Sequence, residues 1–515
     1  MNIDLSKKPL QTFLILILVI AAIIRFATIQ YGTNVDEGVY WSEGKQMYDG
    51  YVMYRDSQFN KTPFVGLVAA FFFNFGDTPI YLMRVTMILA SLLALYVIYR
   101  LGVELFGVAA GLFALTFMAL EPFTAVWAKY LHTSSWTPWY EAAIYWFLLV
   151  GFRQQDWKRL FLSGFVLGIF ALTKQTAIYV LPVALLGWFL FSSRKNLRGF
   201  LVEGGVWLAG ILLLWIPFLL YIFTVAGFSN FWFDIWTAHH LMADAFAHHT
   251  FLFRWHDWLS IFFLAPLLWV LPLGALVLFQ GKYFKPAVFV WGWLIVEILG
   301  NVVLISHVWR HYYLAVMLPA ALLAGAFLQW LLEMAFHRRI LKGAVNSQVW
   351  VYGFLTLLII GMMLTYPRND WRYPGLTLEE ERILAKHIAR YNKTGYLLNL
   401  TNPAFYVWLD REVPPAYQGE RMTRMPYFMT IAGRGYVQPE DMVRTVKFWE
   451  TLPLDTVIAY DKFLQQIVDD PLMEPLEQWL TRDFKPPQRV AMGESYYGWF
   501  WLFHHRETEK MEKSE

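Results

Sequence analysis

Eleven apolar runs separated by short polar segments fill residues 1–366. The first covers 10–29 and follows two lysines, Lys7 and Lys8. The other ten lie at roughly 79–100, 107–127, 136–152, 159–173, 176–192, 200–226, 258–280, 286–305, 312–335 and 348–366. About 20 apolar residues cross the hydrocarbon core of a bilayer, so these runs predict membrane-spanning helices. A shorter run, 64–75, predicts a helix that lies along the interface or enters it partway.

Basic residues occupy alternate loops between these runs. They are Lys7, Lys8, Arg100, Arg153, Lys158, Arg159, Arg194, Lys195, Arg198, Lys282, Lys285, Arg338, Arg339 and Lys342. Basic loops face the cytoplasm, which predicts a cytoplasmic amino terminus and, after eleven spans, an external carboxyl-terminal region. The loops 31–78 and 227–257 then share the external side. We predict an integral protein of the plasma or inner membrane.

Residues 367–515 have the pattern of a soluble domain. Thr377 and Glu380 have the spacing of a capping box that begins a helix. Predicted strands at 395–400, 456–460 and 496–503 alternate with helical segments, and a short apolar run covers 405–409. This alternation predicts a small external α/β domain. The predicted organisation is therefore a multi-span domain, 1–366, followed by a domain at 367–515.

Composition agrees with a membrane protein and narrows its chemistry. The 515 residues are 57% hydrophobic and 16% charged, whereas soluble domains are about 45–50% apolar and about 25% charged. A net charge of +3 gives no indication of a nucleic-acid partner. The chain has no cysteine, which excludes disulfides, thiolate metal sites and cysteine nucleophiles.

The candidate chemistry begins with two adjacent carboxylates, Asp36 and Glu37, just after the first apolar run. The same loop contains Arg55 and Lys61, and Arg84 lies near the outer end of the next span. Carboxylates and cations would thus gather at one membrane interface, where a lipid-borne phosphate would lie. The alternative is an ordinary solvated loop.

Other polar residues have structural alternatives. His240, Asp244 and His248 are spaced by four, so one helical face would present three ligands for a metal such as Zn²⁺. We favour an interfacial helix there, because Phe231, Trp232, Phe233 and Trp236 form an aromatic patch. For three further features we expect structural roles: snorkelling of Arg25, a hydrogen bond between Glu297 and Asn301, and close helix packing at Gly164 and Gly168.

Three segments, in order along the chain, resemble a known family. They are Asn34-Val-Asp-Glu-Gly-Val-Tyr40 with the later Asn60-Lys-Thr-Pro63, then Ala171-Leu-Thr-Lys174, then Ser306-His-Val-Trp-Arg-His-Tyr-Tyr-Leu314 with Leu318-Pro-Ala320. They are similar to segments of the protein-mannosyltransferases and aminoarabinose transferases (glycosyltransferase family 39 and its bacterial relatives). Two departures are notable. Thr62 replaces the commoner proline, and the loop 128–135 lacks the acid that many members carry there.

The resemblance implies the multi-span GT-C fold and an inverting glycosyltransferase. The donor would be a sugar on a polyprenyl phosphate or diphosphate, and the acceptor a lipid, protein or glycan. Asp36 would be the general base, with Glu37 beside it. The implied phosphate-binding side chains are Lys61, Arg84, Lys174, Arg310 and His311, and possible substrate contacts are Arg55, Tyr40 and Glu141. No cofactor is certain, and a divalent metal is possible if Glu141 or Glu121 substitutes for the missing acid.

Two other classes remain as alternatives. A lipid or solute transporter or flippase would show paired inverted halves with broken midplane helices, and we find no such pairing. A membrane-anchored binding protein would place its function in residues 367–515 and would need no acidic pair in the first loop.

Overall fold

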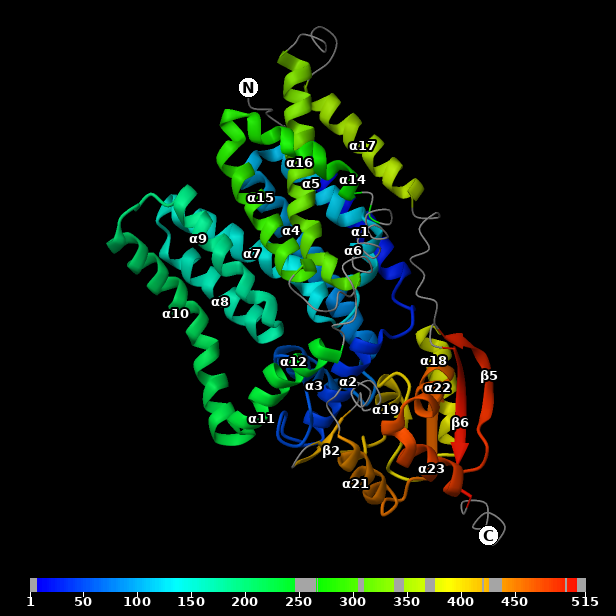
Figure 1. Cartoon of the computed structure of the whole chain (residues 1–515). Coiled ribbons are helices and arrows are strands. Elements are labelled where there is room, and N and C mark those ends of the chain that lie inside the picture. The colour runs from blue at the N-terminus through cyan, green and yellow to red at the C-terminus, as the bar shows by residue number, and fades with distance from the viewer. Residues whose placement is uncertain are drawn as a thin grey trace. The chain divides into compact units, whose positions relative to one another are not determined.

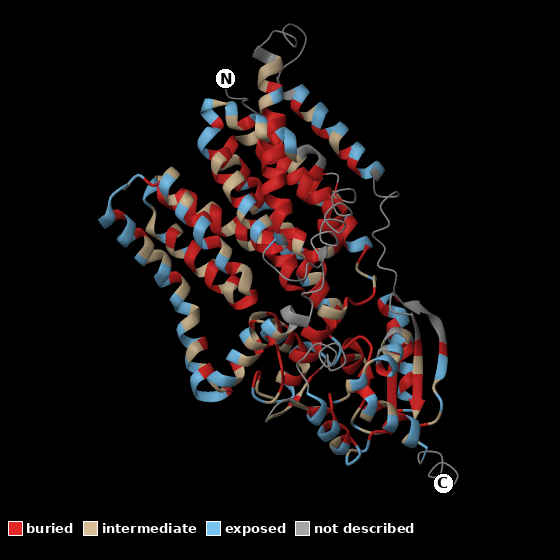
Figure 2. Cartoon of the chain, viewed as in Figure 1, coloured by how far each residue is buried: buried red, intermediate tan, exposed pale blue. Residues whose placement is uncertain are grey.

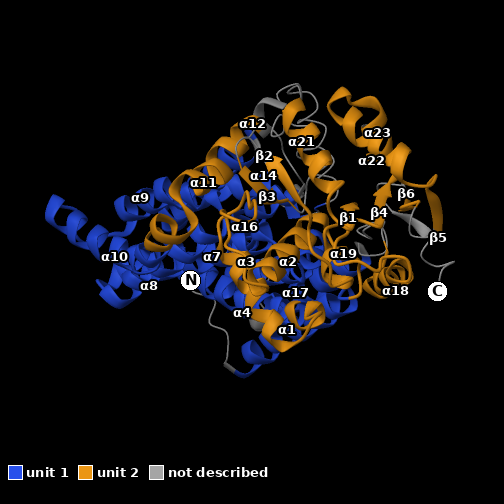
Figure 3. Cartoon of the chain, turned by 90° about the horizontal axis from the view of Figure 1, so that it is seen from below, with its two compact units in different colours: residues 1–29, 84–218, 249–371 blue, residues 30–83, 219–248, 372–515 orange. Residues whose placement is uncertain are grey.

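The computed structural model describes residues 7–245, 265, 267–303, 310–337, 347–365, 376–418, 421–425, 438–495 and 498–506. Its residues form two units, which Figure 3 distinguishes. Unit 1 comprises 1–29, 84–218 and 249–371, and unit 2 comprises 30–83, 219–248 and 372–515. The loop 31–78 thus belongs to the same unit as the carboxyl-terminal region.

Unit 1 is a bundle of apolar helices (Figure 1). They are α1 (Lys7–Ala27), α4 (Ile80–Phe106), α5 (Val108–Leu120), α6 (Pro122–Trp127), α7 (Thr133–Gln154), α8 (Trp157–Thr173), α9 (Val180–Phe191), α10 (Leu197–Tyr221), α14 (Leu267–Gly274), α15 (Phe284–Ile298), α16 (Leu314–His337) and α17 (Ser347–Thr365). Each predicted span coincides largely with helix in the residues that the structure describes.

Five helices in the described part of the chain are long and apolar enough to cross a membrane. They are Lys8–Ala27, Ile80–Phe106, Leu197–Ala226, Gly281–Asn301 and His311–Ala335. Shorter apolar helices cover Phe64–Phe75, Val108–Leu120, Gln175–Phe191 and Val349–Leu364. The predicted spans 136–152 and 159–173 coincide with α7 and α8, which are in neither group.

Small residues permit close packing at the centre of unit 1. Every residue of α5 after Val108 is buried, and α5 packs on the equally buried α16 (Figure 2). A Cβ on Gly325 of α16 would lie 2.5 Å from the backbone oxygen of Ala110. A Cβ on Gly164 of α8 would lie 1.9 Å from the backbone oxygen of Trp207, which confirms the predicted packing role of that glycine.

The predicted span 107–127 is two helices, because Glu121 interrupts it. Glu121 has extended backbone angles, and its side chain accepts a 2.8 Å hydrogen bond from the amide of Thr124 to cap α6. Arg25 of α1 donates to the backbone oxygens of Ala119 at 2.9 Å and Met118 at 3.4 Å, at the end of α5. The snorkelling interpretation of Arg25 was therefore wrong, since its buried guanidinium satisfies the carbonyls that a helix end exposes.

Unit 2 contains the carboxyl-terminal α/β region and parts of the loops 31–78 and 227–257. Its helices are α2 (Val35–Tyr48), α3 (Phe64–Phe72), α11 (Phe228–Trp232), α12 (Ala238–Ala245), α18 (Leu378–Ala389), α19 (Ala404–Trp408), α21 (Pro439–Trp449), α22 (Asp461–Asp469) and α23 (Glu474–Asp483). Its strands are β1 (Leu398–Leu400), β2 (Pro415–Gln418), β3 (Arg421–Arg424), β4 (Thr456–Tyr460), β5 (Gln488–Ser495) and β6 (Gly498–His504). The capping box at Thr377 and the strand at 456–460 are confirmed.

One four-stranded sheet has the order β1-β4-β6-β5, with β1 parallel to β4 and the other pairs antiparallel. The hairpin β2–β3 is separate from that sheet, and it pairs with the loop 31–78 through a bridge between Ser57 and Arg424. The amide of Gln58 donates to the oxygen of Arg424 at 3.0 Å, and the amide of Arg424 donates to the oxygen of Asp56 at 3.0 Å. Backbone pairing therefore joins the loop to the carboxyl-terminal region within unit 2.

Candidate functional site

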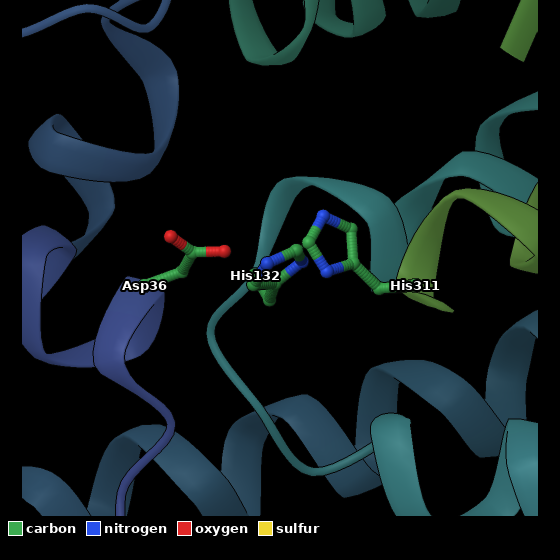
Figure 4. Close-up of side chains that lie close together, drawn as sticks. All are labelled: Asp36, His132 and His311. Carbon is green, nitrogen blue, oxygen red and sulfur yellow. The ribbon is translucent and has the colours of Figure 1, made fainter. Parts of the chain in front are cut away.

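Asp36 lies in the first turn of α2, which Asn34 caps. The Oδ1 atom of Asn34 accepts a 2.8 Å hydrogen bond from the amide of Asp36, as expected for an Asn N-cap. Figure 4 shows the Asp36 carboxylate projecting from the start of α2. The first turn of a helix favours negative charge because its amides point outward unpaired, so this position suits a carboxylate that must be ionised.

The turn before Asp36 is fixed by the carboxyl-terminal region of unit 2. The amide and hydroxyl of Thr33 donate to Oε1 of Glu381 at 2.8 and 2.7 Å, and the side-chain amide of Asn402 donates to the Thr33 oxygen at 3.1 Å. A Cβ on Gly38 would lie 2.1 Å from Oδ1 of Asn402 and 2.8 Å from the amide nitrogen of Ala404. The glycine after the acidic pair is thus required for this close approach.

The neighbours of Asp36 in the sequence have different environments. Glu37 is fully buried, and Tyr40 is buried with its ring 6.1 Å edge-on from Phe59. Arg55, in contrast, is half exposed and pairs with the adjacent Asp56 at 2.9 Å. Tyr40 therefore contributes to the interior of unit 2, and Arg55 has a local carboxylate partner.

Lys61 has an electrostatic interaction with Asp36 in unit 2. Burial lowers the pKa of the Lys61 amine, and the negative charge of Asp36 opposes that shift. The backbone oxygen of Lys61 accepts a 2.9 Å hydrogen bond from the hydroxyl of Tyr54, a fully buried residue. The predicted base and one predicted cation are thus electrostatically coupled.

Two more predicted cations are buried in unit 1, each with an aromatic ring and an oxygen partner. Arg84 donates to the Ile29 oxygen at 2.7 Å, and its guanidinium carbon is 5.0 Å from the Tyr130 ring centroid. The Lys174 amine donates to Oγ of Ser134 at 2.9 Å and is 4.9 Å from the Tyr312 ring centroid. Buried cations are costly to maintain near a bilayer, so they are often functional.

His311 lies against His132, which begins α7. Their ring centroids are 4.4 Å apart (Figure 4), and Trp127 contacts both rings. The Nδ1 atom of His132 accepts a 3.1 Å hydrogen bond from the amide of Ser134, so Nε2 carries the proton in the neutral ring. Two imidazoles supply nitrogen ligands for a metal, although catalytic zinc uses three protein ligands.

Our sequence prediction did not include Lys129 and His132 among the candidates. Lys129 is fully buried, donates to the Val126 oxygen at 2.8 Å and is 4.0 Å from the Tyr130 ring centroid. Both residues lie in the loop 128–135, where we sought only a missing acid. Besides Arg25, the described part of unit 1 therefore buries five basic side chains: Arg84, Lys129, His132, Lys174 and His311.

Glu141 forms a buried pair with Glu297. Their carboxyl groups are within hydrogen-bonding reach of each other, and both interact electrostatically with Lys174. The side-chain amide of Asn301 donates to Oε2 of Glu297 at 2.6 Å, which confirms the predicted hydrogen bond. Glu141 is therefore an electrostatic neighbour of a candidate phosphate ligand.

The predicted metal candidates are only partly described. The His240 residue is exposed, and its ring lies against Trp236 in a tilted arrangement, with centroids 4.8 Å apart. His248 and the side chains of Asp244 and Arg310 lie outside the described residues. The roles of these residues stay predictions.

The fold is that of the GT-C membrane glycosyltransferases, and the resemblance predicted from the sequence is confirmed. Residues 60–222 match the family model of dolichyl-phosphate-mannose-protein mannosyltransferase. No curated protein sequence matches the chain. The apolar helices and these similarities identify an integral membrane protein.

Several solved structures share the fold over nearly the whole chain. ArnT from Cupriavidus metallidurans bound to undecaprenyl phosphate is 16% identical, with a TM-score of 0.58 and coverage of 95% of this chain and 97% of that chain. Apo ArnT gives 15% identity, a TM-score of 0.61 and coverage of 96% and 98%. The Archaeoglobus fulgidus oligosaccharyltransferase gives 11% identity, a TM-score of 0.55 and coverage of 96% and 74%.

Proposed function

We propose that this protein is a membrane glycosyltransferase that takes a sugar from a polyprenyl-phosphate donor at the external face of the membrane. The observation that carries the proposal is the set of buried basic side chains Arg84, Lys129, His132, Lys174 and His311 in unit 1, because a lipid-linked phosphate is a ligand that such side chains would bind. The similarity to ArnT, whose structure contains undecaprenyl phosphate, supports the same class of donor.

In the proposed reaction the acceptor attacks the anomeric carbon and Asp36 takes the proton from its hydroxyl or amine. A bond forms between the acceptor and the sugar, and the bond from the sugar to the phosphate oxygen breaks on the opposite face. The configuration at the anomeric carbon is therefore inverted. The leaving phosphate keeps the electron pair, so its negative charge needs stabilisation by preorganised donors.

The candidate phosphate ligands are Lys61 in unit 2 and Arg84, Lys174 and His311 in unit 1, together with Lys129 and His132. Lys and Arg present charged donors to phosphate oxygens, and the aromatic rings beside Arg84 and Lys174 restrict their side chains. Arg310 is retained from the sequence prediction. Each ligand is to be tested by its own substitution.

The test is a transfer assay with the purified protein in liposomes and a panel of sugars on undecaprenyl phosphate. Asp36→Asn is expected to reduce turnover by about 10²–10⁴-fold while donor binding is retained, because only proton removal is lost. Asp77→Asn is the matched control, since Asp77 is an exposed acid of the same loop. Lys174→Met is expected to weaken donor binding.

Two outcomes would contradict the proposal. Equal turnover of wild type and Asp36→Asn would exclude Asp36 as the base. Failure to release any sugar, together with measurable movement of lipid or solute across the liposome membrane, would favour the transporter or flippase instead.

A further inference from the structure

Five aromatic rings form a continuous row on the outside of the loop between α10 and α12, in which the first four are stacked and the fifth is tilted. This aromatic ladder consists of Phe223, Phe228, Trp232, Trp236 and His240. The successive ring centroids are 5.3, 5.9, 5.6 and 4.8 Å apart. Phe223 is 65% exposed and Trp236 is 53% exposed, so the stack covers a surface of unit 2 and not its interior.

Helix geometry explains why the rings align. Phe228, Trp232, Trp236 and His240 are four residues apart, which places them on one face of a helix. Phe223 precedes Phe228 by five residues: it lies in the π-helix Ile222–Ala226, and Gly227, with φ of 85°, follows that helix. A positive φ suits glycine, so this residue permits the change of direction that keeps Phe223 stacked on Phe228 at 4° between ring planes.

The opposite face of the same segment is fixed inside unit 2. The Phe231 ring lies 5.2 Å edge-on from Tyr54, and Asp234 pairs with Arg421 and accepts from the amide of Phe59 at 3.2 Å. Ala238 is fully buried in the core of the carboxyl-terminal region. Contacts on the inner face of the segment therefore keep the ladder on the outer face. Asp234, the one Asp, Glu, Lys or Arg in 222–241, lies on the inner face.

The order of side chains along the ladder follows the polarity of a bilayer. Phe223 lies in the apolar helix Leu197–Ala226, and only 17% of the most apolar window of that helix is buried. Along the chain from Phe223, the ladder residues are first Phe, then Trp, whose ring carries an N–H group, and finally His. Trp prefers the headgroup region, where one edge of the ring is in contact with apolar chains and the N–H with water.

We propose that the aromatic ladder binds the lipid surface, with Phe223 and Phe228 on its apolar side and His240 on its aqueous side. The segment then has two functions: its outer face binds lipid, and its inner face holds the loop that carries Lys61. Tyr54, Phe59 and Asn60 of that loop all contact the segment, the last by a 2.7 Å hydrogen bond between its oxygen and Nε2 of His239. The ladder thereby sets the depth at which Lys61 lies.

The test uses the absence of cysteine from the chain, which allows single spin labels without other changes. Phe228→Cys, Trp232→Cys, Trp236→Cys and His240→Cys are labelled in nanodiscs of phosphatidylethanolamine and phosphatidylglycerol. Collision rates with oxygen and with a water-soluble nickel chelate report the depth of each label. Leu213→Cys, an exposed position in α10, provides the lipid reference, and Val468→Cys, an exposed position in α22, provides the aqueous reference.

We expect oxygen accessibility to decrease and nickel accessibility to increase in the order 228, 232, 236, 240, between the two references. Labels as accessible to nickel as the label at 468 would overturn the proposal. Labels protected from both reagents would also overturn it, because a protein partner or a second copy would then cover the ladder. Four positions keep the test valid if one substitution prevents folding.

The effect on the loop rests on the proposed function and has its own readout. A Trp232→Ser/Trp236→Ser variant is expected to raise KM several-fold for a membrane-embedded donor, with turnover of a short-chain soluble donor unchanged. Val468→Ser is the matched control. If the labels lie at the expected depths but the wild-type protein turns over neither donor, the proposed glycosyltransferase function is wrong, and the proposal that the ladder binds lipid is retained. Equal KM values for the membrane-embedded donor in Trp232→Ser/Trp236→Ser and in Val468→Ser would refute the idea that the ladder positions Lys61.

Discussion

Glu43 makes the stability of α2 depend on pH. Its carboxyl group is fully buried, and its Oε1 accepts a 2.6 Å hydrogen bond from Ser57. Burial raises the pKa of Glu43 from about 4.5 to about 8, with a further contribution from the charge of Asp234, and the Ser57 hydrogen bond opposes the shift. The folded protein therefore holds a proton that the unfolded chain releases at neutral pH.

The sign and size of the effect follow from the difference between the two pKa values. Below pH 4.5 both states are protonated and folding has no ionisation cost. Above that pH the unfolded state loses its proton, so stability falls until the folded carboxyl ionises near pH 8. Each pKa unit corresponds to about 1.4 kcal/mol, so the total is about 5 kcal/mol, of which about 4 kcal/mol is lost between pH 5 and pH 9.

The assay is hydrogen–deuterium exchange of the α2 amides between pH 5 and pH 9, corrected for the intrinsic exchange rate. We expect Glu43→Gln to flatten the loss of protection with pH and to exceed wild type in stability at pH 9. The Gln side chain keeps an oxygen for Ser57 and cannot ionise. Glu440→Gln, an exposed acid at the start of α21, should behave as wild type. Protection of wild-type α2 that is constant over this range would refute the reasoning.

Two substitutions test the packing around the candidate site. Gly38→Ala should destabilise unit 2 by about 1–3 kcal/mol, measured as a lower Tm, because its Cβ would overlap Asn402 and Ala404. Gly395→Ala, which has open space around it, should leave the Tm unchanged, and an equal loss in both variants would contradict this account. Arg25→Met should cost about 2–4 kcal/mol because buried carbonyls at the end of α5 lose their donor, whereas the exposed Arg159→Met should cost little. Unchanged stability of Arg25→Met would exclude that role.

The helices of unit 1 were predictable because each apolar run is long and local in sequence. The break at Glu121 was missed, although an acid at the N-cap followed by Pro122 is a recognisable signal for a new helix. Arg25 was misinterpreted for another reason. A basic residue near the end of a span either extends its charge to the interface or binds backbone oxygens. The sequence does not show that α5 ends beside Arg25, so it cannot distinguish the two roles.

The candidate site was predictable only in part. The acidic pair at Asp36 and Glu37 stands out because carboxylates are rare beside an apolar run. Glu381 and Asn402, which hold the turn before Asp36, come more than 340 residues later, and no local pattern connects them to it. Lys129 and His132 were visible in their loop, but one basic residue and one histidine have no spacing that distinguishes them from ordinary loop residues.

Gly38 connects the sequence motif to this distant support. A glycine after an acidic pair could serve the chemistry by exposing the carboxylates, yet its Cα faces Asn402 and Ala404 of the carboxyl-terminal region. The same Asn402 also donates to Thr33, so one side chain contacts both sides of Asp36. A reactive carboxylate is effective only when its support is rigid. The motif around Asp36 therefore encodes a binding surface for the carboxyl-terminal region as well as a base, because the glycine is required by packing and the carboxylate by chemistry.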